Sequence, residues 1–130
     1  MTGYGTAVTV SDAGDVLVAN LNVTDADEGV DVSATGSNDV SNVTVRRSTF
    51  DSVTTGLLFR VTDGAVMRNA TAFRNVVNDS DTGVLIDDSA TPAENRLRDL
   101  EIRQNLITNS STDGIRATST TDTTGIRVTR

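Results

Sequence analysis

The chain has 130 residues, 36% hydrophobic and 22% charged, as expected of one small folded domain. All 11 basic residues are arginine, 18 acidic residues set a net charge of -7, and histidine and cysteine are absent. A histidine general base, a thiolate nucleophile, a disulfide and a Cys/His zinc site are therefore excluded. The acidic balance disfavours binding to nucleic acid, and without a long apolar run we expect no direct membrane span.

The acidic residues are 15 aspartates and only 3 glutamates. This excess, with arginine in place of lysine, resembles the composition of proteins from salt-loving archaea. High net charge keeps a chain soluble but makes it repel itself, and concentrated salt screens that repulsion. We therefore expect a halophilic source, with a small acidic domain of another origin as the alternative.

The chain repeats itself along its length. Gly29, Gly56 and Gly83 follow one another at intervals of 27 residues, and Gly5 and Gly114 extend the series with small length changes. Repetition on this scale is typical of stacked architectures. We expect a single domain over residues 1–130 made of about five similar units.

Each unit carries three apolar marks in the same order. Alternating pairs follow first the glycine and then an Asp or Asn, and a single apolar residue closes the unit. Period-two alternation with many β-branched residues predicts short strands with one buried face, hence three short strands per unit and an all-β fold. The pairs begin at Val30, Leu57, Val84 and Ile115 and at Val16, Val43, Ala70 and Leu100, and the closing residues are Val23, Phe50, Val77 and Ile107.

Two all-β folds compete at this point. A sandwich gives no reason for similar residues to return at a fixed interval. A parallel solenoid stacks each strand on its counterpart one unit later, about 4.8 Å away, so equivalent positions touch. On that basis Val32, Phe59 and Ile86 form one interior column. The repeat therefore favours the solenoid.

One segment also fits a helix. Thr91 to Glu94 has the form of a capping box with proline at the first helical position, and residues 94–104 contain many helix formers. A helix running to Gln104 would remove the strand marks at Leu100 and Ile102. We expect strand there, with a short helical turn near Pro92 as an option.

The units resemble the right-handed parallel β-helix of the pectin-lyase-like superfamily. Residues 45–50 with 56–58, 72–77 with 83–86, and 102–107 with 114–115 carry this resemblance. In that family an inward Asn between two strands often stacks into a ladder, and Ser48, Asn75 and Asn105 occupy the matching place. Because the last unit stops after its second strand, we expect an excerpt of a longer solenoid, or an oligomer that covers the ends.

Three aspartates are candidate catalytic residues. Asp87 and Asp88 follow directly on an expected strand, and Asp113 precedes Gly114 one unit later. They are similar to the carboxylate motifs of polygalacturonases, which implies general acid and base work on a glycosidic bond. Here the order of the two motifs is reversed and the family's glycine-histidine-glycine element is missing. Turn carboxylates are the simpler interpretation.

The resemblance also implies a lyase. Pectate lyases of this fold hold calcium with carboxylates and use an arginine as base. Asp79, Asp81, Asp87 and Asp88 are the candidate metal ligands, expected with Asp113 near one edge of the stack, and oxygen ligands suit calcium. Their spacing matches no fixed calcium loop, so solvated acidic turns are the alternative.

Several arginines gather on another edge. Arg46, Arg47, Arg74 and Arg103 fall on the turn after the second strand, with Phe73 expected to be exposed beside them. Stacked about 5 Å apart, they would form a basic stripe able to bind a sulfated or uronic polysaccharide. The alternative is ion pairing within the chain, with Asp51, Asp99 and Glu101 as partners.

Five asparagines begin an Asn-X-Ser/Thr acceptor sequence: Asn22, Asn42, Asn69, Asn78 and Asn109. They favour a glycosylated, exported protein. We expect a non-catalytic structural or glycan/partner-binding segment of an extracellular or cell-surface protein, without a cofactor. A fragment of a polysaccharide lyase-like enzyme and a viral tail-spike or fibre segment are the alternatives.

Overall fold

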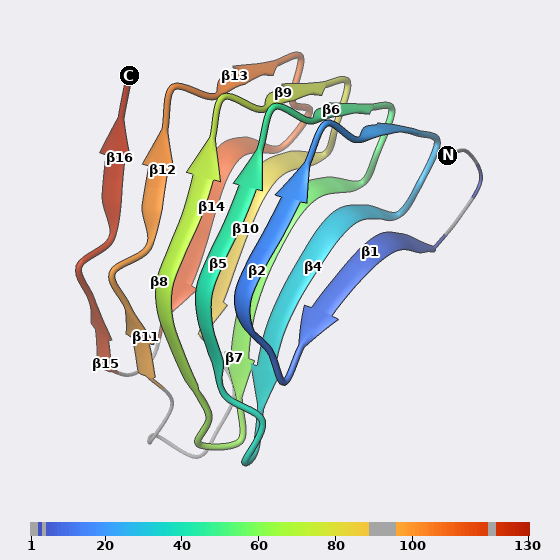
Figure 1. The fold of residues 1–130 in the computed structure, drawn as a ribbon. Helices are drawn as coiled ribbons and strands as arrows, with labels where there is room; N and C mark the ends of the chain where they lie inside the picture. Colours follow the sequence, from blue (N-terminus) through green and yellow to red (C-terminus); the bar gives the residue numbers. More distant parts are fainter. Residues whose placement is uncertain (1–2, 4, 89–95, 120–121) are drawn as a thin grey trace.

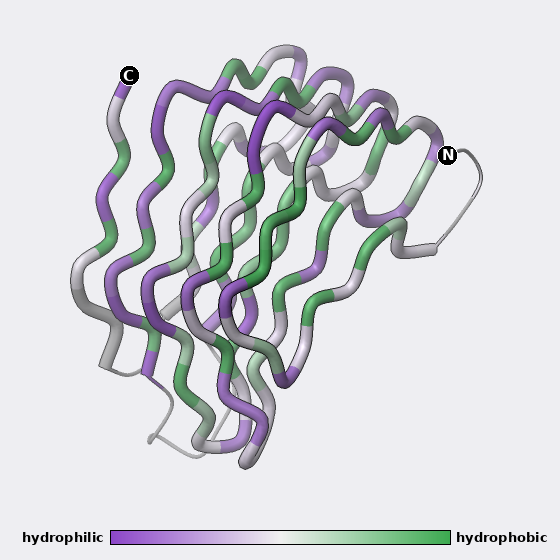
Figure 2. The backbone as a smooth tube through the Cα atoms, in the orientation of Figure 1, coloured by the Kyte–Doolittle hydropathy of each residue, from purple (hydrophilic) through white to green (hydrophobic). Residues whose placement is uncertain are grey.

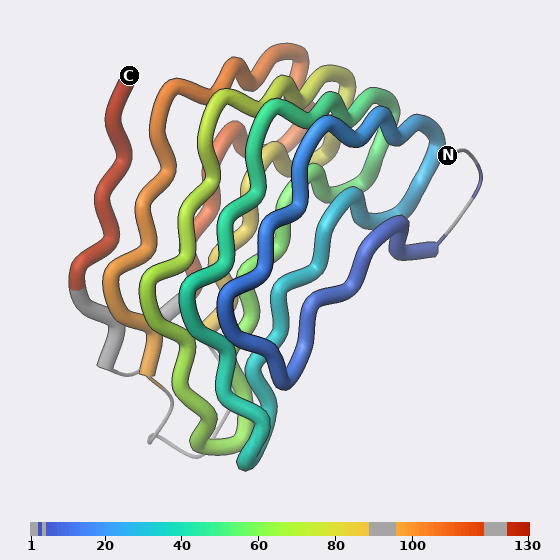
Figure 3. The backbone as a smooth tube through the Cα atoms, in the orientation of Figure 1, coloured from blue at the N-terminus to red at the C-terminus, as the bar shows by residue number. Residues whose placement is uncertain are grey.

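The computed structural model describes residues 3, 5–88, 96–119 and 122–130. Within these ranges the regular structure is entirely β-strand, and no helix is present that could cross a membrane. The strands form three parallel sheets that wind into a solenoid (Figures 1 and 3).

Sheet I contains one strand from each turn: β1 (Thr6–Ser11), β4 (Glu28–Thr35), β7 (Thr55–Thr62), β10 (Thr82–Asp88) and β14 (Asp113–Ser119). Sheet II contains β2 (Gly14–Ala19), β5 (Val40–Arg46), β8 (Val66–Phe73), β11 (Arg96–Arg98), β12 (Glu101–Arg103), β15 (Asp122–Thr124) and β16 (Arg127–Thr129). Sheet III contains β3 (Asn22–Thr24), β6 (Thr49–Asp51), β9 (Val76–Asn78) and β13 (Leu106–Thr108). The described chain therefore makes four complete turns and part of a fifth, and the predicted solenoid is confirmed.

The pairing register follows the sequence repeat from Gly29 onward, whereas Gly5 falls outside the glycine series, because β1 pairs with β4 at an offset of 22 residues and Ala7 lies opposite Gly29. Val32 pairs with Phe59, and Phe59 with Ile86, which is the predicted interior column. Hydrophobic residues recur at the same place in successive turns (Figure 2). Small and large side chains complement one another in the third turn, where Ala70 and Ala72 on sheet II share the fully buried core with Leu57 and Phe59 on sheet I.

The three central glycines of the repeat, Gly29, Gly56 and Gly83, have a packing cause, whereas a Cβ atom at Gly5 or Gly114 would meet no atom closer than 3.9 Å. A Cβ atom on Gly56 would lie 2.6 Å from the carbonyl oxygen of Gly83 and 2.7 Å from Cγ1 of Val77. Gly29 meets the ring of Phe50 and the next turn in the same way. The core side chain of sheet III therefore occupies the space that a side chain at the glycine would need.

The bends between straight segments use the left-handed backbone region in three columns. Such φ values favour Asn, Asp and glycine. One column lies within sheet II, one between sheets II and III, and one between sheets III and I. In that order their members are Asp15, Asn42, Asn69 and Asp99; Asn20, Arg47, Arg74 and Gln104; and Asp25, Ser52, Asp79 and Asn109, all with φ between 49 and 58°.

An inner ladder of side chains lies between sheets II and III, as predicted, at Ser48, Asn75 and Asn105. Oδ1 of Asn75 accepts from the backbone N–H of Ser48 at 3.1 Å, and Oδ1 of Asn105 accepts from that of Asn75 at 2.8 Å. Nδ2 of Asn75 donates to the carbonyl of Val45 at 2.9 Å, and Nδ2 of Asn105 to that of Ala72 at 2.9 Å. The ladder thus satisfies backbone groups that the strands leave without partners.

The choice between strand and helix near residue 100 is settled. β11 and β12 are strands, Leu100 is fully buried between them, and Ile102 pairs with Ala72. The option of a helical turn near Pro92 lies outside the described residues. In the last turn, Ile115 and Val128 are 37% and 54% exposed, because no described strand lies beyond β14 and β16.

Candidate functional site

The predicted basic stripe forms a compact group at the end of the sheet II strands, the Arg–Phe cluster of Arg46, Phe73, Arg74 and Arg103. Phe73 pairs with Arg46 on one side and Arg103 on the other. The guanidinium carbon of Arg103 lies 4.3 Å from the centroid of the Phe73 ring, and that of Arg74 lies 4.7 Å away. Phe73 is half-buried rather than exposed as expected, because these two guanidinium groups cover its ring.

Part of the cluster is used within the chain. Nε of Arg74 donates to Oε1 of Gln104 at 3.0 Å, and Nε of Arg103 lies 3.4 Å from a carboxylate oxygen of Glu101. Of the three acidic partners considered for the arginines, only Glu101 is paired with a cluster member in the recorded contacts; Asp51 instead accepts from Asn78 at 2.6 Å. The residues expected to bind an anionic polysaccharide are therefore the same ones that make contacts within the chain.

Arg46 and Arg47 differ in their surroundings. Nε of Arg46 is buried without a hydrogen-bond partner, and its side chain has no recorded ion pair. Arg47 is exposed in the left-handed column of Arg74, at the bend, and makes no recorded contact with the Phe73 ring. The structure thus brings Arg46, Phe73, Arg74 and Arg103 together, with Arg47 beside them.

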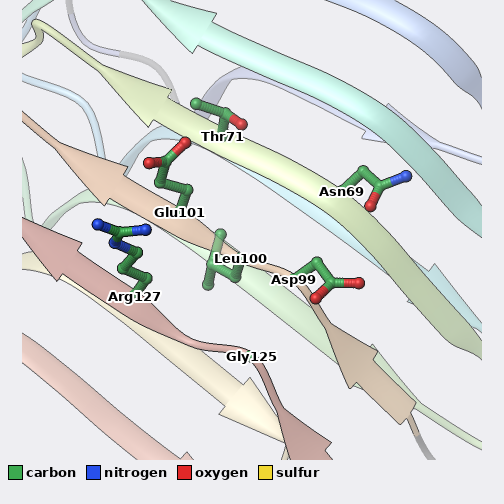
Figure 4. Close-up of a pocket in the computed structure, with 7 residues that line it drawn as sticks. All are labelled: Asn69, Thr71, Asp99, Leu100, Glu101, Gly125 and Arg127. Atoms are coloured by element: carbon green, nitrogen blue, oxygen red, sulfur yellow. The ribbon is translucent and has the colours of Figure 1, made fainter.

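An open depression of about 350 Å³ lies on the same sheet, next to the Arg–Phe cluster. It is lined by Asn69, Thr71, Asp99, Leu100, Glu101, Gly125 and Arg127 (Figure 4). The sequence predicted Asn69 as a strand entry and an acceptor asparagine, and Asp99 as a strand entry and an arginine partner, but gave Arg127 no role. The signal was present in the series of Asp15, Asn42, Asn69 and Asp99, which stack in the structure.

The candidate catalytic carboxylates are separated. Asp113 pairs with Thr82 at the first residue of β10, whereas Asp87 and Asp88 end that strand. At about 3.3 Å per residue, Asp113 lies about 16 Å from Asp87 along the strand, well beyond the 5 to 9.5 Å that a glycosidase pair uses. Asp88 is fully buried, while Asp87 lies 3.6 Å from Nε of Arg60.

The expectation that the candidate metal ligands share one edge is not met. Asp79 and Asp81 precede β10, and Asp87 and Asp88 lie at its far end, because this strand is seven residues long. The hydroxyl of Ser111 donates to Asp81 at 2.8 Å. Among the residues placed by the structure, no group of three or more carboxylates has the geometry of a metal site.

The five acceptor asparagines occupy different environments. Asn42 and Asn69 belong to the outer face of sheet II, where their amides bond along a column. Asn78 is half-buried and bonds to Asp51, Thr108 and Asn109. Asn22 and Asn109 are exposed. Asn42 and Asn69 are exposed as well, so only Asn78 is partly buried among the five.

A family model described as a right-handed β-helix region matches residues 2–129. No curated protein and no solved structure matches the chain.

Proposed function

Since the chain belongs to the right-handed β-helix family, we propose that it is a non-catalytic segment of an extracellular or cell-surface protein from a halophile, and that it binds an anionic polysaccharide through the Arg–Phe cluster. The observation that carries the proposal is the Phe73 ring covered by the guanidinium groups of Arg74 and Arg103 at 4.7 and 4.3 Å. This arrangement concentrates positive charge on one face of a chain whose net charge is -7.

Stacking on the ring also prepares the arginines for a ligand. A guanidinium held against an aromatic ring loses less conformational freedom when it binds, and its planar fork suits a carboxylate or sulfate. Arg46 adds a third guanidinium in register with Phe73 and carries no recorded ion pair. Strand spacing of about 4.8 Å sets the interval between the binding groups, which suits a repeating polymer.

The non-catalytic part of the proposal rests on the carboxylates. Hydrolysis of a glycosidic bond needs two carboxyl groups on either side of it. Asp113 and Asp87 lie at opposite ends of neighbouring strands, and Asp88 is buried in the interior. These positions favour structural roles for the three aspartates.

The test is binding of polygalacturonate and dextran sulfate, with neutral dextran for comparison, by calorimetry at fixed ionic strength. The double variant Arg74→Gln, Arg103→Gln is expected to bind the polyanions at least about tenfold more weakly, since two charge-assisted contacts are lost. The matched control is Arg116→Gln, which removes an exposed arginine on sheet I that lies 4.0 Å from Asp113. Equal weakening by the control, or no weakening by the double variant, would contradict the proposal.

A further inference from the structure

A second column of side chains, the outer ladder, runs across the solvent face of sheet II through Asp15, Asn42, Asn69 and Asp99. All four have left-handed backbone angles, with φ of 57, 53, 52 and 57°. Nδ2 of Asn42 donates to Oδ1 of Asp15 at 2.9 Å, and Nδ2 of Asn69 donates to Oδ1 of Asn42 at 3.0 Å. Both amides therefore direct their donors toward the first turn.

The outer ladder has too few donors. It contains three junctions, but only Asn42 and Asn69 carry side-chain N–H groups, and an ionised carboxylate only accepts. If each amide directs its N–H groups toward one neighbour, one junction must have acceptors on both sides, whichever way the amides are turned. With the amides as described, this junction lies between Asn69 and Asp99, and no contact recorded for the described residues gives the Asp99 carboxylate a donor.

The donor-deficient junction opens into the depression. Glu101 pairs with Arg127, so the next residue in the column after Asp99 is Gly125, which has no side chain to cover it. A Cβ atom at Gly125 would lie 2.7 Å from Oδ1 of Asp99. Asn69 and Asp99 lie at one end of the depression, while Arg127 lies on the side of Glu101 (Figure 4).

We propose that this depression binds a primary ammonium group at the junction between Asn69 and Asp99. An ammonium carries three donors and no acceptor, which is what two facing acceptors lack. Its hydrogen bonds to a carboxylate are charge-assisted and stronger than those of a hydroxyl, for which water competes equally well. Glu101 adds a second carboxylate on the same surface, shared with Arg103 at 3.4 Å. Asn69 and Asp99 lie outside the Arg–Phe cluster, and Glu101, through its contact with Arg103, is the residue that connects the two sites.

The test is a titration followed by NMR chemical shifts of the backbone amides, with methylammonium chloride replacing sodium chloride at constant ionic strength. Shifts are expected around Asn69, Asp99 and Gly125. Glucosamine is compared with glucose, and Nα-acetyl-lysine amide with Nα-acetyl-alanine amide, to distinguish an amino sugar from a lysine side chain as the source of the ammonium. No shift at these residues with methylammonium, or the same shifts with potassium or calcium chloride, would overturn the proposal.

Two variants separate the ammonium site from general charge effects. Asp99→Asn supplies the missing donor, keeps a residue that accepts positive φ, and is expected to weaken methylammonium binding at least about tenfold. Asp25→Asn is the matched control, because Asp25 is also exposed with φ of 55° but lies in a different column. Equal loss in both variants, or none in Asp99→Asn, would contradict the assignment.

A remote variant tests the count of donors itself. Asp15→Asn places a third amide at the far end of the outer ladder, three strand spacings or about 14 Å from Asp99. All amides can then turn toward Asp99, so that Asn69 donates to it. Methylammonium binding is expected to fall severalfold, although the substituted residue does not line the depression. Binding at full affinity would show that the junction does not depend on the ladder.

Discussion

The inner and outer ladders both consist of stacked polar side chains, but only the inner ladder has a donor and an acceptor at each of its junctions. Inside, Asn75 and Asn105 pair their amides with backbone groups of the strands, and each recorded junction has a donor and an acceptor. Outside, Asp15 and Asp99 cap a column whose two amides cannot serve three junctions. Burial explains the difference, because a buried polar group without a partner is costly, whereas water tolerates one at the surface. An incomplete ladder is therefore permitted only where a solvent molecule or a ligand can reach it.

The largest effect is expected from removing an inner amide. Asn75→Ala leaves the buried N–H of Ser48 and the carbonyl of Val45 without their partners, which costs about 3 to 5 kcal/mol. Asn42→Gly is the matched control on the outer ladder, since glycine keeps the positive φ, and should cost under about 1 kcal/mol. Chemical unfolding measures both. Similar losses would show that burial does not distinguish the ladders.

A second variant increases the deficit of the outer ladder. Asn69→Asp removes the donor to Asn42. It also gives the outer ladder a third carboxylate, next to that of Asp99. We expect a loss of about 1 to 2 kcal/mol at low ionic strength that shrinks toward 1 M salt, where the Debye length is about 3 Å. Thermal unfolding at the two salt concentrations measures it. A loss independent of salt would contradict the electrostatic cause.

The smallest expected effect is an increase in stability. Asp99→Asn completes the outer ladder and is expected to raise the free energy of unfolding by about 0.5 to 1 kcal/mol relative to Asp25→Asn, which has the same change of charge. Urea unfolding of both variants without added amine measures the difference. If Asp25→Asn gains as much, relief of net charge rather than the new donor is responsible.

The fold could be predicted from the sequence because its repeat has a physical cause at each position. Gly56 recurs where a side chain would collide with Val77, and Asn75 recurs where backbone groups need a partner. These constraints act within a turn or between neighbouring turns, and they recur along the stack. Spacing therefore identified the strands and the interior columns, and the family resemblance pointed to the inner ladder.

The candidate sites were predicted less well, because they depend on the length of the strands and on side chains that come from several turns. Arg46, Phe73 and Arg103 were placed together correctly since they share one register position. Asp81 and Asp87 were assigned to one edge without allowing for the length of β10, whose residues 82–86 separate them. The depression beside Gly125 was missed, because its lining comes from three neighbouring turns rather than from one motif of the sequence.

The pairing registers show where this architecture accepts extra chain. Paired residues are 22 positions apart where β1 meets β4 but 27 apart where β2 meets β5, as Val8 with Val30 and Val16 with Val43 show. Between sheets II and III the offsets agree in each turn. Length variation thus concentrates at the bend from sheet I to sheet II, which none of the three left-handed columns occupies. That bend is where a foreign loop or a peptide epitope could be grafted while the columns on the other bends stay in register.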